Sequence, residues 1–397
     1  MWVTSCSLWR VPMANPLPPP APLSGVRVVD LSRILAGPLC TMMLADLGAD
    51  VIKVERPGEG DDTRHWGPPF AGDDAAYFLS LNRNKRSVVA DLGTPEGVEL
   101  VRGLAASADV LIENFRPGLM ERFGLGLEAL RATHPRLLTC SLTAFGEGAP
   151  EAAARPGYDI IVQALSGLMS VTGERDGEPV KVGVALLDVI TGLDATIGIL
   201  AALHERDSTG NGRHVSVALY DASIAAMVNQ AANVLIGGVV PGPMGTEHPN
   251  IVPYQAFPAS DRPFILAAGN DRLFARACDV VGHPGWATDP RFVTNEGRVE
   301  HRAELISLLT DAFSERPARE WLELLEGAAV PCSPILRLDE VFASEDGAAR
   351  IEDVPDTARG TLRLVANPIR FDGMAPVTRI SPPRLGEHQG ATWKDEA

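Results

Sequence analysis

Four arginines stand near the predicted carboxyl ends of strands: Arg33, Arg56, Arg116 and Arg122. In an open parallel sheet, ligands bind at the edge that these strand ends form. The guanidinium group suits phosphate because it donates two parallel hydrogen bonds. A single arginine of this kind is more often a solvated surface residue. Four at the same edge favour a polyphosphate ligand, such as a coenzyme A (CoA) thioester.

Asp188 is the second candidate for chemistry, because it is a lone carboxylate in an apolar run, LLDVI, at the start of a predicted helix. A positioned carboxylate can act as a nucleophile. Aspartate is also a common N-cap of helices. The two roles can coexist, since donors at a helix start favour the ionised form. From spacing alone, both interpretations stay open.

The hydrophobic pattern predicts strands that alternate with helices, which is the scaffold these residues need. A strand, a helix and a strand in about 30 residues form a βαβ unit with a right-handed crossover. The predicted fold class is therefore α/β, with a large Rossmann-like domain built on an open parallel sheet and a smaller second domain. The predicted strands of the large domain are Val26–Leu31, Asp50–Glu55, Ser87–Asp91, Asp109–Asn114, Leu137–Thr143 and His214–Ala218, and its helices are Pro38–Asp46, Pro95–Ala106, Leu127–Thr133, Leu187–His204 and Asp221–Leu235.

Four segments are predicted along the chain. Residues 1–22 are proline-rich and weakly charged, so we expect a disordered tail in which either Met1 or Met13 is the biological start. Residues 23–235 form the amino-terminal part of the large domain. Residues 236–330 form a Gly/Pro-rich linker and the small domain. Residues 331–397, rich in strand and turn signals, return to the large domain because they are too short for a core of their own.

A dinucleotide site would need the pattern GxGxxG between the first strand and helix. The junction here reads SRILAGP and holds one glycine. Glu55 ends the next strand, where an acid can bind a ribose hydroxyl. Arg56 beside it suits a ribose phosphate better. The missing motif argues against a nicotinamide enzyme.

Composition excludes several other classes. Acidic residues outnumber basic ones by 51 to 35, a net charge of −16 over 397 residues, which disfavours nucleic-acid binding. No uninterrupted apolar run approaches the ~20 residues of a membrane helix. The five cysteines show no CxxC spacing, so no zinc site or disulfide framework is indicated. A reduced, cytoplasmic location is the simplest interpretation.

Recognisable sequence blocks occur in order along most of the chain. They are Leu23–Arg64, LNRNKRS (Leu81–Ser87), ADVLIENFRPG (Ala108–Gly118), RPGYD (Arg155–Asp159), SGLMSVTG (Ser166–Gly173), VGVALLDVITG (Val182–Gly192), GTEHPNIVPYQAF (Gly245–Phe257), AAGNDRLF (Ala267–Phe274), AAVPCSPI (Ala328–Ile335) and LGEH (Leu385–His388). These blocks resemble the class III CoA-transferases, the CaiB/BaiF family that includes formyl-CoA transferase. The similarity covers residues 23 to 390 and is closest to the succinate–hydroxymethylglutarate CoA-transferase branch.

The resemblance places the family's catalytic aspartate on Asp188. It also implies a set of CoA contacts, although the His and Gln that the family often has in its first loop are Arg33 and Leu35 here. The implied CoA-binding residues are Arg33, Ile34, Ala36, Arg56, Leu92, Asn114, Phe115 and Arg122.

On the substrate side, the resemblance points to Tyr158 and Asp159. Related racemases have histidine where this chain has Tyr158, and a phenol with a pKa near ~10 is a poor proton shuttle at neutral pH. A dicarboxylate would leave one carboxylate in need of a cation, for which Arg64 and His248 are candidates. Two further cations, Arg83 and Lys85, are more consistent with structural ion pairs.

The expected activity is transfer of CoA from an acyl-CoA to a free carboxylic acid, such as succinate or a glutarate, through an aspartyl anhydride and an aspartyl-CoA thioester. This chemistry needs no metal and no permanently bound cofactor, since the CoA thioester is a substrate. The family resemblance also implies an interlocked, ring-like homodimer. The alternatives are an acyl-CoA racemase or epimerase of the same fold and a non-catalytic CoA-binding protein.

Overall fold

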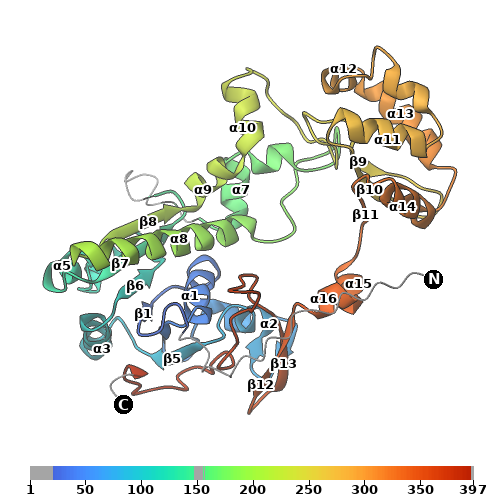
Figure 1. Ribbon diagram of the computed structural model, residues 1–397. Helices are drawn as coiled ribbons and strands as arrows, with labels where there is room; N and C mark the ends of the chain where they lie inside the picture. The colour runs from blue at the N-terminus through green and yellow to red at the C-terminus, as the bar shows by residue number, and fades with distance from the viewer. Residues whose placement is uncertain (1–20, 147–154, 156, 395–397) are drawn as a thin grey trace. The chain divides into compact units, whose positions relative to one another are not determined.

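The computed structural model describes residues 21–146, 155 and 157–394, so the predicted tail lies outside it except for residues 21 and 22. The chain divides into two compact units, each described separately below (Figure 1). Unit 1 comprises Met1–Pro156, Asp188–Leu219 and Glu352–Ala397, and unit 2 comprises Gly157–Leu187 and Tyr220–Ile351.

A six-stranded sheet in the order β5-β2-β1-β6-β7-β8 forms the centre of unit 1, and all its pairings are parallel. The chain starts at β1, adds strands toward one edge, and then continues on the other side of β1. This is the doubly wound order of Rossmann folds, in which ligands bind beside the reversal. The strands are β1 (Arg27–Asp30), β2 (Asp50–Glu55), β5 (Lys85–Val89), β6 (Val110–Glu113), β7 (Leu138–Thr143) and β8 (His214–Ala218).

Two helices pack on one face of this sheet. They are α1 (Ala36–Asp46) and α8 (Leu186–Thr209), which share a core with the strands through side chains such as Leu44, Ile199 and Val28. By length and composition α8, with a mean hydropathy of 1.8, could also cross a membrane. A single helix of this kind is weak evidence for a membrane span, and the core packing gives its apolar composition a structural reason.

The opposite face is covered by α3 (Pro95–Ala106) and its neighbours. The Thr94 hydroxyl caps α3 by accepting from Gly97 N at 3.2 Å, and proline stands at the first helical position. Further elements of unit 1 are η1 (Asp62–His65), β3 (Phe70–Ala71), β4 (Asp74–Ala75), α2 (Ala76–Leu79), α4 (Leu119–Arg122), α5 (Leu127–Thr133), β12 (Ile351–Asp356) and β13 (Gly360–Val365).

The carboxyl-terminal segment covers the outer edge of β5. His388 N donates to Ser87 O at 2.9 Å, and the side-chain amide of Gln389 pairs with Val89, accepting from its N at 2.8 Å and donating to its O at 3.2 Å. Trp393 then enters the core with only 2% of its surface exposed. These contacts protect an edge strand that would otherwise offer unpaired backbone groups.

Unit 2 has its own antiparallel sheet, in the order β11-β10-β9, and an aromatic core. Phe313 packs against Phe257 and Phe264, with ring centroids 5.1 Å apart in both pairs. The elements of this unit are α7 (Asp159–Leu165), η2 (Leu168–Val171), α9 (Leu219–Ala226), α10 (Val228–Leu235), β9 (Tyr254–Phe257), β10 (Phe264–Ala267), α11 (Asp271–Val280), η3 (Pro284–Thr288), α12 (Asn295–Glu300), α13 (Arg302–Phe313), α14 (Ala318–Gly327), β11 (Cys332–Pro334), α15 (Leu338–Ala343) and α16 (Glu345–Ala348).

The predicted α/β class with an open parallel sheet is confirmed. β2, β8 and α3 begin and end at the predicted residues. The predicted helix Asp221–Leu235 is instead two helices, α9 and α10, because Val228 has a φ of 37°. The unit boundaries also differ from the predicted ranges. Residues 157–187 and 220–235, and the first part of the carboxyl-terminal segment, belong to unit 2.

Candidate active site

The reversal of strand order lies between β1 and β6, and reciprocal hydrogen bonds join the segments that follow these two strands. Arg33 N donates to Asn114 Oδ1 at 2.9 Å, and Asn114 Nδ2 donates to Arg33 O at 2.7 Å. Ile34 then takes a φ of 73°, which is costly for a β-branched residue. Its N–H donates to the Asp61 carboxylate, 3.3 Å from each oxygen. Polar contacts thus hold the loop in a strained conformation of the kind found at functional sites.

A cavity of about 400 Å³ lies at the carboxyl ends of β1, β2 and β5. Four of the predicted CoA-binding residues line it: Arg33, Arg56, Leu92 and Phe115. Its volume is in the range of small-molecule sites, and its position beside the strand reversal is the one expected for a ligand of this fold.

Asp62 orients the two arginines of this cavity. It lies 3.3 Å from Arg33 Nη1 and 2.9 Å from Arg56 Nη2, and both arginine side chains are about 40% exposed. The Arg33 guanidinium also lies 5.6 Å from the centroid of the Phe115 ring. Two preoriented guanidinium groups beside an aromatic ring suit a ligand that combines phosphates with a flat base.

A buried ion pair forms part of the lining of this cavity. Lys53 Nζ lies 2.9 Å from Asp61 Oδ2 and donates to Ser32 O at 2.8 Å. Burial alone would raise the pKa of Asp61, but the Lys53 ammonium lowers it to about 2. Sequence analysis missed both residues. The available signal was a lysine between the apolar residues Ile52 and Val54, in the middle of strand β2.

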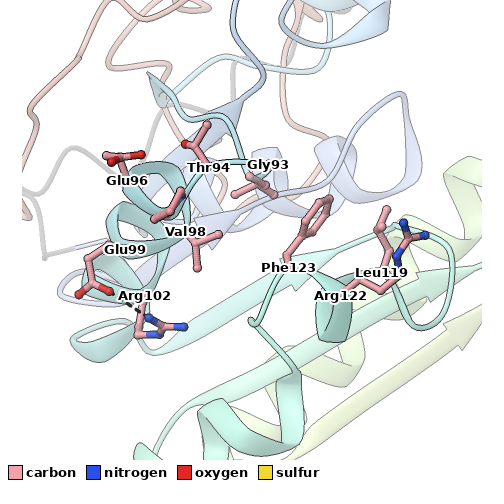
Figure 2. A pocket seen from close by; sticks show the side chains of 11 residues that line it. Gly93, Thr94, Glu96, Val98, Glu99, Arg102, Leu119, Arg122 and Phe123 are labelled. Atoms are coloured by element: carbon pink, nitrogen blue, oxygen red, sulfur yellow. Dashed lines mark hydrogen bonds and ion pairs between the residues drawn. The ribbon is translucent and has the colours of Figure 1, made fainter.

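Arg122 lines a second, more open hollow next to the first, of about 850 Å³. Figure 2 shows Glu96, Glu99 and Arg102 of α3 on one side of this hollow and Leu119, Arg122 and Phe123 on the other. Leu92 lines both hollows. The remaining predicted CoA contacts line neither hollow. Ile34 belongs to the loop that precedes α1, Asn114 holds this loop, and Ala36 is the first residue of α1.

Asp188 is the third residue of α8, so it stands in the first turn rather than at the N-cap. A Cβ on Gly192, one turn later, would lie 2.6 Å from Ala36 O, and the Thr196 hydroxyl bonds to the Cys40 thiol another turn along. These two contacts show that α8 and α1 run side by side in the same direction. One turn back, Asp188 comes level with the loop before α1. This register places the first turn of α8 at the level of the loop before α1.

The predicted substrate-side residues of unit 2 lie in two places. Tyr158 is 57% exposed and precedes α7, whereas Asp159 is buried and accepts a hydrogen bond from Leu187 N at 2.8 Å. His248 Nδ1 accepts from Asn250 N at 3.1 Å. Partial burial and the nearby Arg302 lower the pKa of His248, which favours a neutral ring near pH 7.

Arg64 requires a correction. It is 2% exposed and forms a bidentate pair with Glu55, at 2.8 and 2.7 Å, and a further ion pair with Asp74 at 2.6 Å. Its donors are used inside unit 1, so it is a structural residue rather than a substrate contact. The structural interpretation of Arg83 and Lys85 is confirmed, because Arg83 pairs with Asp46 and Lys85 with Asp30 inside the core.

Among the residues that the structure describes, no three His, Cys, Asp or Glu side chains are grouped so as to hold a metal ion.

The comparisons with known proteins agree with this geometry. The model of CoA-transferase family III matches residues 23–389. The chain is 45% identical to a succinate–glutarate CoA-transferase of Agrobacterium fabrum, over 93% of this chain and 94% of that protein. It is 42% identical to the succinyl-CoA:glutarate CoA-transferase of Mus musculus, over 92% and 84% of the two chains. A CaiB/BaiF family protein from Brucella suis has a similar solved structure, with a TM-score of 0.81 and 45% identity over 93% of this chain and 97% of that one.

The doubly wound sheet of unit 1 and the match along nearly the whole chain define the class of protein. The chain belongs to CoA-transferase family III, the CaiB/BaiF family, and is an acyl-CoA:carboxylate CoA-transferase.

The contact between α8 and α1 predicts that Gly192→Ala lowers activity. The added methyl would meet Ala36 O at 2.6 Å, so the helices must separate and Asp188 must shift relative to the cavity loop. We expect a loss of about 1–3 kcal/mol in unfolding free energy and a fall in kcat. The control is Gly103→Ala on α3, where nothing lies within 4 Å of the new Cβ. It should stabilise the protein slightly, and equal behaviour of the two variants would contradict the contact.

The Asp61–Lys53 pair predicts a pH dependence of stability. The pKa of Asp61 is depressed to about 2 in the folded protein, so its contribution is present above its unfolded value and is lost as the pH falls from ~4 to ~2. Urea unfolding of wild type and Asp61→Asn should therefore differ by about 2 kcal/mol more at pH 6 than at pH 2. The exposed Asp73→Asn is the control, and a constant difference for Asp61→Asn across this range would refute the assignment.

Proposed function

We propose that this enzyme transfers CoA between an acyl-CoA and a dicarboxylate, with succinyl-CoA and glutarate as the first pair to test, through covalent intermediates on Asp188. The observation that carries the proposal is the position of Asp188 on α8, one turn before the contact between Gly192 and Ala36 and level with the loop of the CoA cavity. The names of the two relatives support the choice of acids.

The reaction begins when an Asp188 carboxylate oxygen attacks the thioester carbonyl carbon of the donor. A C–O bond forms, the C–S bond breaks, and CoA departs as a thiolate, leaving a mixed anhydride on the enzyme. The thiolate then attacks the Asp188 carbonyl carbon. This step releases the donor acid as a carboxylate and leaves an aspartyl-CoA thioester.

The second half reverses these steps with the acceptor. Its carboxylate attacks the aspartyl-CoA carbonyl, and CoA thiolate departs as a second anhydride forms. The thiolate attacks the acceptor carbonyl, which yields the new thioester and restores the Asp188 carboxylate. Electrons and atoms balance without any oxidant or reductant.

The cavity residues have a clear task in this cycle. CoA must stay bound while its thiolate leaves and returns, so the nucleotide end has to be held independently of the reacting sulfur. Arg33 and Arg56 would bind its phosphates and Phe115 would contact the adenine, while Arg122 and Leu92 extend the surface. Tethering of this kind makes the return of the thiolate effectively intramolecular.

We also propose a cytoplasmic location. Cys40 and Cys278 are buried thiols, and burial raises the pKa of each to about 12, so both stay protonated. Buried thiols of this kind are typical of proteins from reducing compartments.

The nucleophile is tested by Asp188→Asn. The amide keeps the size of the side chain but loses the anion, so the variant should fold and bind acyl-CoA while CoA exchange falls by several orders of magnitude. Mass spectrometry after hydroxylamine treatment of wild type with succinyl-CoA should place an adduct on the peptide that contains Asp188. Asp207→Asn, an exposed site on the same helix, is the control.

A fully active Asp188→Asn enzyme without an adduct would exclude the nucleophile. Exchange of the α-proton of the substrate with solvent deuterium would then favour the racemase alternative. An inactive wild type that still binds CoA would favour the non-catalytic alternative.

We infer a homodimer, as the family resemblance implies. Unit 2 exposes large apolar side chains close together in sequence, with Leu235 84%, Ile236 88% and Val240 84% exposed, which a second copy would cover. Light scattering should give a mass near twice 42.3 kDa that persists on dilution. Leu235→Asp should weaken the assembly, and a stable, active monomer of the wild type would contradict the inference.

A further inference from the structure

We propose that Asp159 and Gln163 are positioning residues for Asp188, an inference that rests on the proposed nucleophile. They form a chain of hydrogen bonds that holds the segment 182–187 and thereby fixes the start of α8. This role differs from the substrate contact that the sequence suggested for Asp159.

The chain of hydrogen bonds runs through two side chains of α7. Asp159 Oδ1 accepts from Leu187 N at 2.8 Å, and Asp159 Oδ2 accepts from Gln163 Nε2 at 2.5 Å. Gln163 Oε1 accepts from Val182 N at 2.9 Å. Gln163 and Leu187 are fully buried, and Asp159 is 8% exposed. Both ends of the segment 182–187 are therefore fastened to one helix, by a buried bond at Leu187 and a half-buried bond at Val182.

The hydrogen bond from Leu187 N to Asp159 gives an acceptor to one of the unpaired N–H groups at the start of α8. The first N–H groups of a helix have no acceptor within the helix, and Leu187 is the second residue of α8. A carboxylate is the favoured partner at this end because the helix dipole is positive there. Asp159 therefore provides an acceptor for this N–H group from outside the helix.

The proposed reaction requires the Asp188 carboxylate to stay in a fixed position through successive steps. The same carboxylate must reach an acyl carbon and later present its own carbonyl to the thiolate, so its helix start has to keep one register throughout. A misplacement of about 1 Å can cost on the order of 100-fold in rate. Without the clamp, the first turn of α8 would be free to fray.

The donor and acceptor pattern of the chain allows a sharp test. In Asp159→Asn the new amide still accepts from Leu187 N, but its NH₂ faces the NH₂ of Gln163. In Gln163→Glu the new carboxylate accepts from Val182 N, but its second oxygen faces the Asp159 carboxylate. Each single change breaks the chain at the same link. The double variant restores that link, because the amide at 159 donates to the carboxylate at 163.

Wild type, both single variants and the double variant are compared for succinyl-CoA exchange and for backbone hydrogen exchange in the peptide that spans residues 182–190. Each single variant should lower kcat by about 10- to 100-fold with KM for succinyl-CoA within about threefold. Both should speed amide exchange in this peptide. The double variant should recover most of kcat and protection, while Asp207→Asn, the control on the same helix, should change neither.

Single variants with wild-type kcat, or a double variant no better than the worse single one, would overturn the proposal. If the single variants fail to fold, recovery of folding in the double variant supports the chain and its failure overturns it. Hydrogen exchange also separates this proposal from the proposed function. Loss of protection with no effect of Asp188→Asn on activity would refute the nucleophile and with it the catalytic part of the clamp.

Discussion

Two buried ammonium groups hold the loop on which the site in unit 1 depends. Lys53 of β2 donates to Ser32 O, and Lys85 of β5 donates to Pro38 O, both at 2.8 Å. Burying such charges is costly unless carboxylates and further hydrogen bonds compensate for the lost water. Asp61 lies beside Lys53, and Asp30 beside Lys85. Although burial opposes ionisation, the two lysines hold the pKa of Asp30 below its usual value, so the cluster stays charged.

Hydrogen bonds at both ends of the loop between β1 and α1 can stabilise a backbone conformation that would be unfavourable in an isolated peptide. This explains how Ile34 retains a φ of 73° while Arg33 and Asn114 bridge the ends of β1 and β6. The same fastening fixes where α1 begins, and the backbone of Ala36 is the surface against which Gly192 of α8 packs. The cavity, the loop and the helix that carries Asp188 are thereby parts of one packed body. Loss of a single charge from the buried cluster would disturb all three, since breaking a buried pair typically costs ~3–5 kcal/mol.

The parts of the structure that follow from local pattern could be predicted from the sequence. Strand β2 is a short run that contains the β-branched residues Val51, Ile52 and Val54 and is bounded by turn residues, and the cap and proline of α3 mark its first turn. Arg33 and Phe115 follow strands directly, so the rule for parallel sheets placed them at the cavity. What the sequence could not supply are contacts between distant segments. Nothing in the spacing of these residues along the sequence indicates that Arg64 would form buried ion pairs with Glu55 and Asp74.

The position of Asp188 shows why such distant contacts matter. The block around it resembles its family so closely that its role could be inferred, yet what holds it in place could not. Leu187, directly before it, bonds to a carboxylate 28 positions earlier in the chain. Gly192, one turn after it, packs against α1, more than a hundred residues away. A first helical turn is normally the part of a helix most prone to fray, because its N–H groups lack partners. Here it is held on both sides of Asp188. The covalent mechanism proposed for Asp188 needs such a hold, since the aspartyl carbonyl must meet the thiolate at the place where the carboxylate displaced it.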